Sequence, residues 1–175
     1  ELLDSESCAY QSNIHGFTLD NHGCALDIGA HIGVFSRLML SKGCKHIICY
    51  EPEPSNFELL VQNLDVDGLE DASLQPIIEL HAEAVAHGPS QTRKLVRARN
   101  QNDGTENTWR HSLEEYSQYV DKTTDMPSAS QLKILERIDV TSVPFFGGAL
   151  VPGVTLVKLD CEGAEIDILI SEEAS

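Results

Sequence analysis

The chain has 175 residues, of which 41% are hydrophobic and 23% charged, a composition typical of one soluble globular domain. Its formal net charge is −16 at pH 7, from 28 acidic and 12 basic residues. That charge argues against a nucleic-acid surface, which must neutralise phosphates, and against docking on anionic lipid. The sequence has no long apolar run, so we expect no membrane span.

The five cysteines form no C-x-x-C motif, and no His and Cys residues have the spacing of a zinc site. Cys24, Cys49 and Cys161 lie in or beside predicted strands, where a thiol packs as a small apolar group. We therefore predict no metal ligands and expect free thiols in a reducing intracellular compartment.

The first part of the sequence has the order strand, glycine turn, helix, strand, acid. An apolar run contains Asp27, and Gly29 and Gly33 bracket the turn that follows it. A second apolar run leads directly to Glu51. This order is half of a nucleotide-binding α/β unit. The predicted elements are a strand over 25–28, a helix over 34–42 and a strand over 47–50.

Glu51 follows Gly29 by 22 residues, the spacing at which an acid after the second strand binds ribose hydroxyls. His31 stands where a dinucleotide-binding turn has its second glycine, so the close approach of a pyrophosphate is disfavoured. An adenosyl ligand without phosphates, such as S-adenosylmethionine, fits better. In this interpretation Asp27 attracts the ammonium group and Glu51 binds the ribose. The alternative is an ordinary βαβ turn with a surface acid.

The α/β pattern continues after Glu51. Apolar residues at helical spacing predict a helix that begins at Pro54 or Ser55 and ends at Gly68. Glu83 follows the next predicted strand, over 74–80, at the edge where open α/β sheets bind ligands. We therefore consider Glu83 a candidate for the adenine side of the site, with a plain loop acid as the alternative.

A loop-rich insertion over about residues 88–131 interrupts the pattern. Within it, residues 92–98 alternate basic and apolar side chains, which predicts an antiparallel or edge strand with a charged outer face. Residues 109–120 have the spacing of a short helix. We interpret the insertion as a substrate lid within a single domain over 1–175, not as a second domain.

The last part of the sequence again predicts strands and helices. A strand is expected over 132–140, then a short helix that begins near Pro144. The nearly continuous apolar run over 154–159 is typical of a parallel strand that is buried on both faces. Asp160 ends this strand, and the helical segment 161–170 follows.

Asp160, Glu162 and Glu165 form an acidic cluster, D-C-E-G-A-E. Because the carboxyl ends of parallel strands meet at one edge of a sheet, we expect this cluster beside the Gly29 turn. The carboxylates suit a general base for a substrate hydroxyl, hydrogen bonds to that hydroxyl, or a divalent metal. The alternative is that Glu162 and Glu165 only stabilise the N-terminus of a helix through its dipole.

Three sequence blocks resemble the FkbM family of S-adenosylmethionine-dependent methyltransferases, over about residues 26–170. The resemblance implies an α/β fold, the class I methyltransferase (Rossmann-like) doubly wound sheet. The chain departs from the family pattern at His31, where Asn is usual, and lacks the three strands that follow Asp160 in such a sheet. We therefore expect an incomplete domain whose sheet edge is covered by a protein partner or a missing C-terminal segment. The blocks are LDIGAHIGVFS, YEPEPSNFELLVQNL and LVKLDCEGAE.

The resemblance also implies a site and a reaction. Asp160 and Glu162 would lie near the methyl-transfer face, and the reaction would be O-methylation of a small hydroxylated molecule or sugar. The alternative function is a non-catalytic methyltransferase-like subunit of a larger complex. A nicotinamide oxidoreductase is disfavoured because position 31 is not glycine. The positions that match the family's cofactor site are Asp27, Gly29, Ala30, His31, Gly33 and Glu51.

Overall fold

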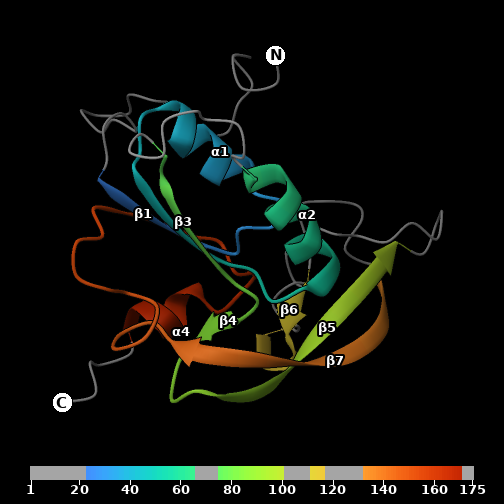
Figure 1. The fold of residues 1–175 in the computed structure, drawn as a ribbon. Coiled ribbons are helices and arrows are strands. Elements are labelled where there is room, and N and C mark those ends of the chain that lie inside the picture. The colour runs from blue at the N-terminus through green and yellow to red at the C-terminus, as the bar shows by residue number, and fades with distance from the viewer. Residues whose placement is uncertain (1–22, 66–74, 101–110, 117–131, 171–175) are drawn as a thin grey trace, which may run out of the picture.

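Two four-stranded sheets and the helices that pack on them make up the described part of the chain (Figure 1). The structure is a computed structural model, and it describes residues 23–65, 75–100, 111–116 and 132–170. The elements in chain order are β1 (Cys24–Ile28), α1 (Val34–Ser41), β2 (His46–Tyr50), α2 (Pro54–Leu64), β3 (Ile77–His81), β4 (Ala84–Ala86), β5 (Gln91–Asn100), β6 (Ser112–Leu113), the 3-10 turn η2 (Glu114–Tyr116), β7 (Leu132–Pro144), β8 (Leu156–Leu159) and α4 (Glu165–Ile170).

The first sheet is parallel throughout, in the order β3-β2-β1-β8. The chain passes from β1 through α1 to β2 and through α2 to β3, and later places β8 on the other side of β1. The strand order therefore reverses between β1 and β8. In open α/β sheets, ligands bind in the crevice outside the carboxyl ends of the strands at such a reversal. The predicted strands and helices of this half are confirmed, with ends shifted by a few residues. The expected helix end at Gly68 and the expected strand start at residue 74 lie outside the described residues.

The two central strands of this sheet are buried on both faces because alternate side chains enter different cores. On one face, Ala25, Ile47 and Cys49 pack against α1 and α2. On the other face, Leu26 and Ile48 pack against the second sheet and α4. Figure 1 shows α1 and α2 on one side of the parallel strands, with α4 and the second sheet on the other. Apolar side chains on both faces are typical of central parallel strands.

The second sheet is built on a long antiparallel pair of strands, β5 and β7, in the order β4-β7-β5-β6. The antiparallel strand predicted over 92–98 is therefore confirmed as part of β5. The expected insertion contributes β5 and β6 to this sheet, and its residues 101–110 and 117–131 lie outside the described residues. Leu95 and Leu113, register partners on these two strands, are buried in the core shared with the first sheet.

Two helix predictions in this region were wrong. Residues 111–116, expected as part of a helix, instead contain β6 and η2, and the rest of that segment lies outside the described residues. β7 continues to Pro144, where a short helix was expected to begin. In both places pairing with a distant strand, β5 or β4, satisfies the backbone, so the local helical pattern does not decide the conformation.

The strand that ends at Asp160 is less buried than its apolar sequence predicted. Among the described residues, β8 is an edge strand of the parallel sheet, and Val157 is 38% exposed. The following helix, α4, buries Ile168 but exposes Ile166 and Leu169. The apolar run therefore identified a parallel strand correctly but not its place in the sheet.

We predict that Gly29→Ala destabilises the protein far more than Gly147→Ala. Both glycines have a positive φ, 74° and 73°, so both substitutions impose the strain of a left-handed backbone. A Cβ at Gly29 would also lie 1.9 Å from the carbonyl oxygen of Asp160, whereas a Cβ at Gly147 meets nothing within 4 Å. In urea unfolding, we expect losses of about 3 kcal/mol or more for Gly29→Ala and about 1 kcal/mol for Gly147→Ala. Equal losses would show that the close contact is unimportant.

Candidate functional site

Three loops that carry predicted site residues meet at the carboxyl edge of the parallel sheet. The N–H groups of Gly29 and Ala30 both donate to the carbonyl of Tyr50 at 3.0 Å, which joins the turn after β1 to the end of β2. On the other side, the N–H of Asp160 donates to the carbonyl of Ile28 at 3.1 Å. The loops after β1, β2 and β8 therefore form one continuous edge at the strand reversal.

The two glycines of the turn fit between other parts of the chain. Gly29 lies against the backbone of Asp160, and a Cβ at Gly33, whose φ is 87°, would lie 2.8 Å from a methyl group of Leu60. A side chain at either position would push the turn away from β8 or from α2. The two glycines in the sequence therefore indicate that this turn packs closely against β8 and α2.

The carboxylate of Glu51 stabilises the same turn. Glu51 is 6% exposed, and its two oxygens accept hydrogen bonds from the backbone N–H groups of His31, at 2.8 Å, and Glu53, at 2.9 Å. Burial raises the pKa of Glu51 to about 7; the charge of Glu53 also raises it, while the two backbone donors lower it. Each oxygen has a further lone pair, so the carboxylate can also accept hydrogen bonds from a ligand.

His31 has a φ of 53°, in the left-handed region where Gly, Asn, Asp and His are the common residues. This conformation gives a physical reason why His31 can stand at a position where the family pattern has Asn. Glu51 contacts the backbone of His31, and that contact does not depend on the side chain. The departure at position 31 is therefore compatible with the turn.

Lys158 is a residue of this edge that was not predicted from the sequence. Its ammonium nitrogen lies 3.2 Å from Oδ1 of Asp27, 3.6 Å from Oδ2 of Asp160 and 2.7 Å from the carbonyl oxygen of Gly29. Asp27 and Lys158 are register partners on the adjacent strands β1 and β8. The sequence feature that could have identified it is a lysine within an otherwise apolar strand. A lysine that is buried in such a strand needs an anionic partner.

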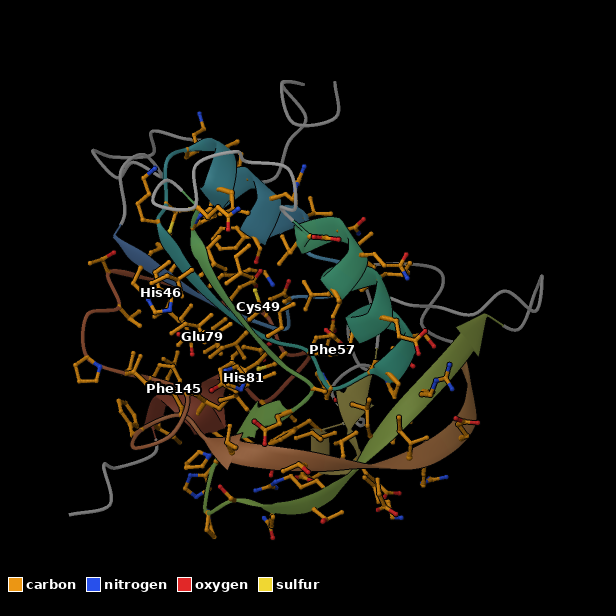
Figure 2. The ribbon with its side chains drawn as sticks, in the orientation of Figure 1. His46, Cys49, Phe57, Glu79, His81 and Phe145 are labelled. Atoms are coloured by element: carbon orange, nitrogen blue, oxygen red, sulfur yellow. The ribbon has the colours of Figure 1, made fainter. Side chains whose placement is uncertain are left out.

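Asp27 is fully buried within a chain of polar contacts beneath the edge. Its Oδ2 accepts a hydrogen bond from the hydroxyl of Ser36 at 2.6 Å, and this hydroxyl lies 3.1 Å from Sγ of Cys49, which Figure 2 labels. Burial raises the pKa of Asp27, while Lys158 and Ser36 lower it. The predicted contact between Asp27 and a ligand's ammonium group stays a prediction; in the structure, Lys158 supplies the cation.

The acidic cluster after β8 divides into residues with different surroundings. Asp160 is the exposed carboxylate, with 61% of its side chain accessible. Glu162 has a φ of 56°, and its carbonyl accepts a hydrogen bond from the hydroxyl of Ser112 in β6 at 2.7 Å. Glu165 accepts two hydrogen bonds, both at 2.8 Å, from backbone N–H groups of the same loop. Glu165 therefore stabilises the loop, and Asp160 is accessible to a ligand.

Glu83 lies between β3 and β4, farther along the sheet from β8. Its carboxylate is 3.7 Å from Nδ1 of His81. His81, which Figure 2 labels, is the last residue of β3. The ring of His81 stacks on that of Tyr50, with 4.5 Å between the ring centroids. The backbone N–H of Glu51 donates to the carbonyl of His81 at 3.0 Å, so Glu83 follows a strand that adjoins the Glu51 loop. Its contact with adenine stays a prediction.

Within the described ranges, no three His, Cys, Asp or Glu side chains are grouped so that they could hold a metal ion. None of the helices in these ranges is both long and apolar enough to cross a membrane.

We predict that Lys158→Met lowers the free energy of unfolding by about 3 kcal/mol, because it leaves the Asp27 carboxylate buried without its cation. Lys94→Met is the matched control: Lys94 pairs with Asp139 at 2.7 Å on the surface, and such exposed pairs contribute less than about 1 kcal/mol. Adding Asp27→Asn to Lys158→Met should restore part of the lost stability. Equal losses for the two lysine variants in denaturant unfolding would contradict this role.

The comparisons with known proteins give one match. A family model described as the methyltransferase FkbM domain matches residues 27–175, which include every described element from Asp27 in β1 to the end of α4. No curated protein and no solved structure gave a significant match. Because the family model covers most of the chain, the chain belongs to the FkbM methyltransferase domain family.

Proposed function

We propose that this domain binds S-adenosylmethionine across the carboxyl ends of β1 and β2 and transfers its methyl group to a hydroxyl oxygen of a small molecule or sugar. The family match over residues 27–175 is the observation that carries the methyl-transfer part of this proposal. The meeting of the Gly29 turn, Glu51 and Asp160 at the reversal between β1 and β8 supports the position of the site.

We also propose that the fold is the class I, Rossmann-like type. The parallel order β3-β2-β1-β8 and the two helical connections β1-α1-β2-α2-β3 support this assignment. Such connections place the carboxyl ends of successive strands on one edge, where loops can surround an extended ligand.

The chemistry of this edge suits an adenosyl ligand. The oxygens of Glu51 are acceptors, and the two hydroxyls of a ribose are donors that such a carboxylate can bind. The turn from Gly29 through Ala30 and His31 to Gly33 would contact the methionine end, with Glu83 on the adenine side. When bound, S-adenosylmethionine supplies an electrophilic methyl group.

Asp27 would act through Lys158 in this proposal. The ammonium group of Lys158 contacts Asp27, the Gly29 carbonyl and Asp160, so it connects the turn under the methionine end to the loop under the acceptor. The buried Asp27 carboxylate fixes that ammonium group. We therefore propose Asp27 and Lys158 as positioning residues.

Asp160 is the residue that we propose as general base. Its exposed carboxylate can accept the proton of an acceptor hydroxyl as methyl transfer develops charge on the oxygen. Glu162, whose backbone is fixed by Ser112, is the second carboxylate that we place at the acceptor side. The chain's main contribution would be to align the acceptor oxygen and to exclude water.

We predict that the affinity for S-adenosylmethionine rises between about pH 6 and pH 8. The pKa of Glu51 is raised to about 7, and its ionised form is the one that accepts ribose hydrogen bonds, so the binding-competent fraction grows with pH. Binding near pH 6.5 should therefore release protons, which calorimetry in buffers of different ionisation enthalpy measures.

Glu51→Gln should abolish this pH dependence, whereas Glu58→Gln, a change on the exposed surface of α2, should preserve it. Binding that is independent of pH would contradict the role of Glu51. Absence of binding at every pH would contradict the cofactor itself and would favour a non-catalytic subunit.

We predict that Asp160→Asn lowers kcat by about 10²-fold or more while the Kd for S-adenosylmethionine stays unchanged, because the base acts on the acceptor. Glu162→Gln should lower kcat or raise the KM of the acceptor. The assay measures transfer of a labelled methyl group to a panel of hydroxylated small molecules and sugars. Asp139→Asn, in an exposed ion pair of the second sheet, is the control. Full transfer by both variants would exclude these roles.

A further inference from the structure

Arg97 connects the second sheet to the loop that follows β2. It lies on β5, and its Nε is 3.3 Å from Oε1 of Glu53, which is buried at the N-terminus of α2. Its Nη1 is 2.7 Å from the carboxylate of Glu136 on β7. Arg97 and Glu53 are far apart in the sequence, so this ion pair joins the second sheet to the end of the parallel sheet.

Glu53 in turn contacts Glu51. One carboxylate oxygen of Glu53 accepts a hydrogen bond from the N–H of Asn56 at 2.7 Å, which caps α2. The backbone N–H of Glu53 donates to Glu51 at 2.9 Å, and the other oxygen of Glu51 binds the N–H of His31 at 2.8 Å. Contacts therefore run without a gap from Arg97 through Glu53 and Glu51 to the turn after β1.

We infer that Arg97 is a positioning residue of the cofactor site: it fixes Glu53 and thereby favours the hydrogen-bonded form of Glu51 that accepts ribose hydroxyls. This inference rests on the proposed function, because it concerns the residue to which ribose binding is assigned. It gives the second sheet an indirect part in cofactor binding, because Arg97 acts through Glu53 and Glu51.

The physical basis is the repulsion between two buried carboxylates in one short loop. The charge of Glu53 disfavours the charge of Glu51. The guanidinium of Arg97 is always protonated and lies 3.3 Å from Glu53, so its charge has the sign that would offset this repulsion. The groups around Glu51 are Glu53 in its own loop, Asn56 on α2 and the backbone of His31 in the turn. Arg97 from β5 acts on this group through Glu53, and Glu136 on β7 lies behind Arg97.

The test compares Arg97→Met and Arg97→Lys with the control Lys94→Met in the full chain. NMR titration of the Glu51 carboxyl without cofactor gives its midpoint, and calorimetry gives the affinity for S-adenosylmethionine as a function of pH. Arg97→Met should move both midpoints to higher pH and weaken binding at pH 7 about tenfold. Arg97→Lys, which retains the charge, should leave both midpoints close to the wild-type values, and Lys94→Met, which removes an exposed cation from the same strand, should not change them.

Glu53→Gln should shift the titration midpoint of Glu51 in the opposite direction. It removes the charge that disfavours ionised Glu51 but retains an oxygen that can accept from Asn56, so the Glu51 midpoint should move to lower pH. This variant decides the question if Arg97→Met does not fold. Midpoints that stay unchanged in the Arg97 and Glu53 variants would overturn the inference. If the wild-type chain binds no S-adenosylmethionine, the proposed function fails, while the cofactor-free titration still tests the coupling.

Discussion

The buried ion pair between Asp27 and Lys158 is the interaction on which the geometry of the sheet edge depends. The two residues are register partners across the strand reversal, so their attraction acts where the chain has to bring β1 and β8 together. Because Lys158 also donates to the carbonyl of Gly29, one ammonium group stabilises both the strand pair and the turn. A charge buried at this point is costly without its partner. The ion pair therefore connects the position of the turn to the pairing of β1 with β8.

Two glutamates stabilise the loops at this edge of the sheet by accepting hydrogen bonds from backbone N–H groups. Backbone N–H groups that lie beyond the end of a strand lose their partners in the sheet and must find others. Glu51 accepts from one such group after β1, that of His31, and from one after β2, that of Glu53, while Glu165 accepts from two after β8. In each loop one carboxylate therefore fixes the backbone. Asp160 is then the accessible acid of the D-C-E-G-A-E segment, a distinction that the sequence pattern of this segment does not contain.

Local patterns predicted the parts of the fold that local interactions determine. Glycine positions and apolar spacing identified the turn at Gly29 and the elements around it, because backbone conformation and helix periodicity are properties of neighbouring residues. The contacts made by Lys158 and Arg97 were not predicted, since their partners lie on strands that are distant in the sequence. For the same reason β6 was mistaken for a helix: Ser112 pairs with Val96, a contact that no local pattern contains. Cofactor and acceptor contacts stay predictions.

The second sheet contacts two loops of the candidate site, the Glu51 loop and the Asp160 loop. Arg97 on β5 binds Glu53, and Ser112 on β6 binds the carbonyl of Glu162. Ser112 is the register partner of Val96, the neighbour of Arg97, so these two contacts arise from adjacent positions of one strand pair. A shift of this pair would therefore disturb the Glu51 loop and the Asp160 loop together. Because Leu95 and Leu113 of the same strands are buried in the main core, a lid movement that included β5 and β6 would expose that core. These two strands are accordingly better understood as a fixed support for the site than as a moving cover.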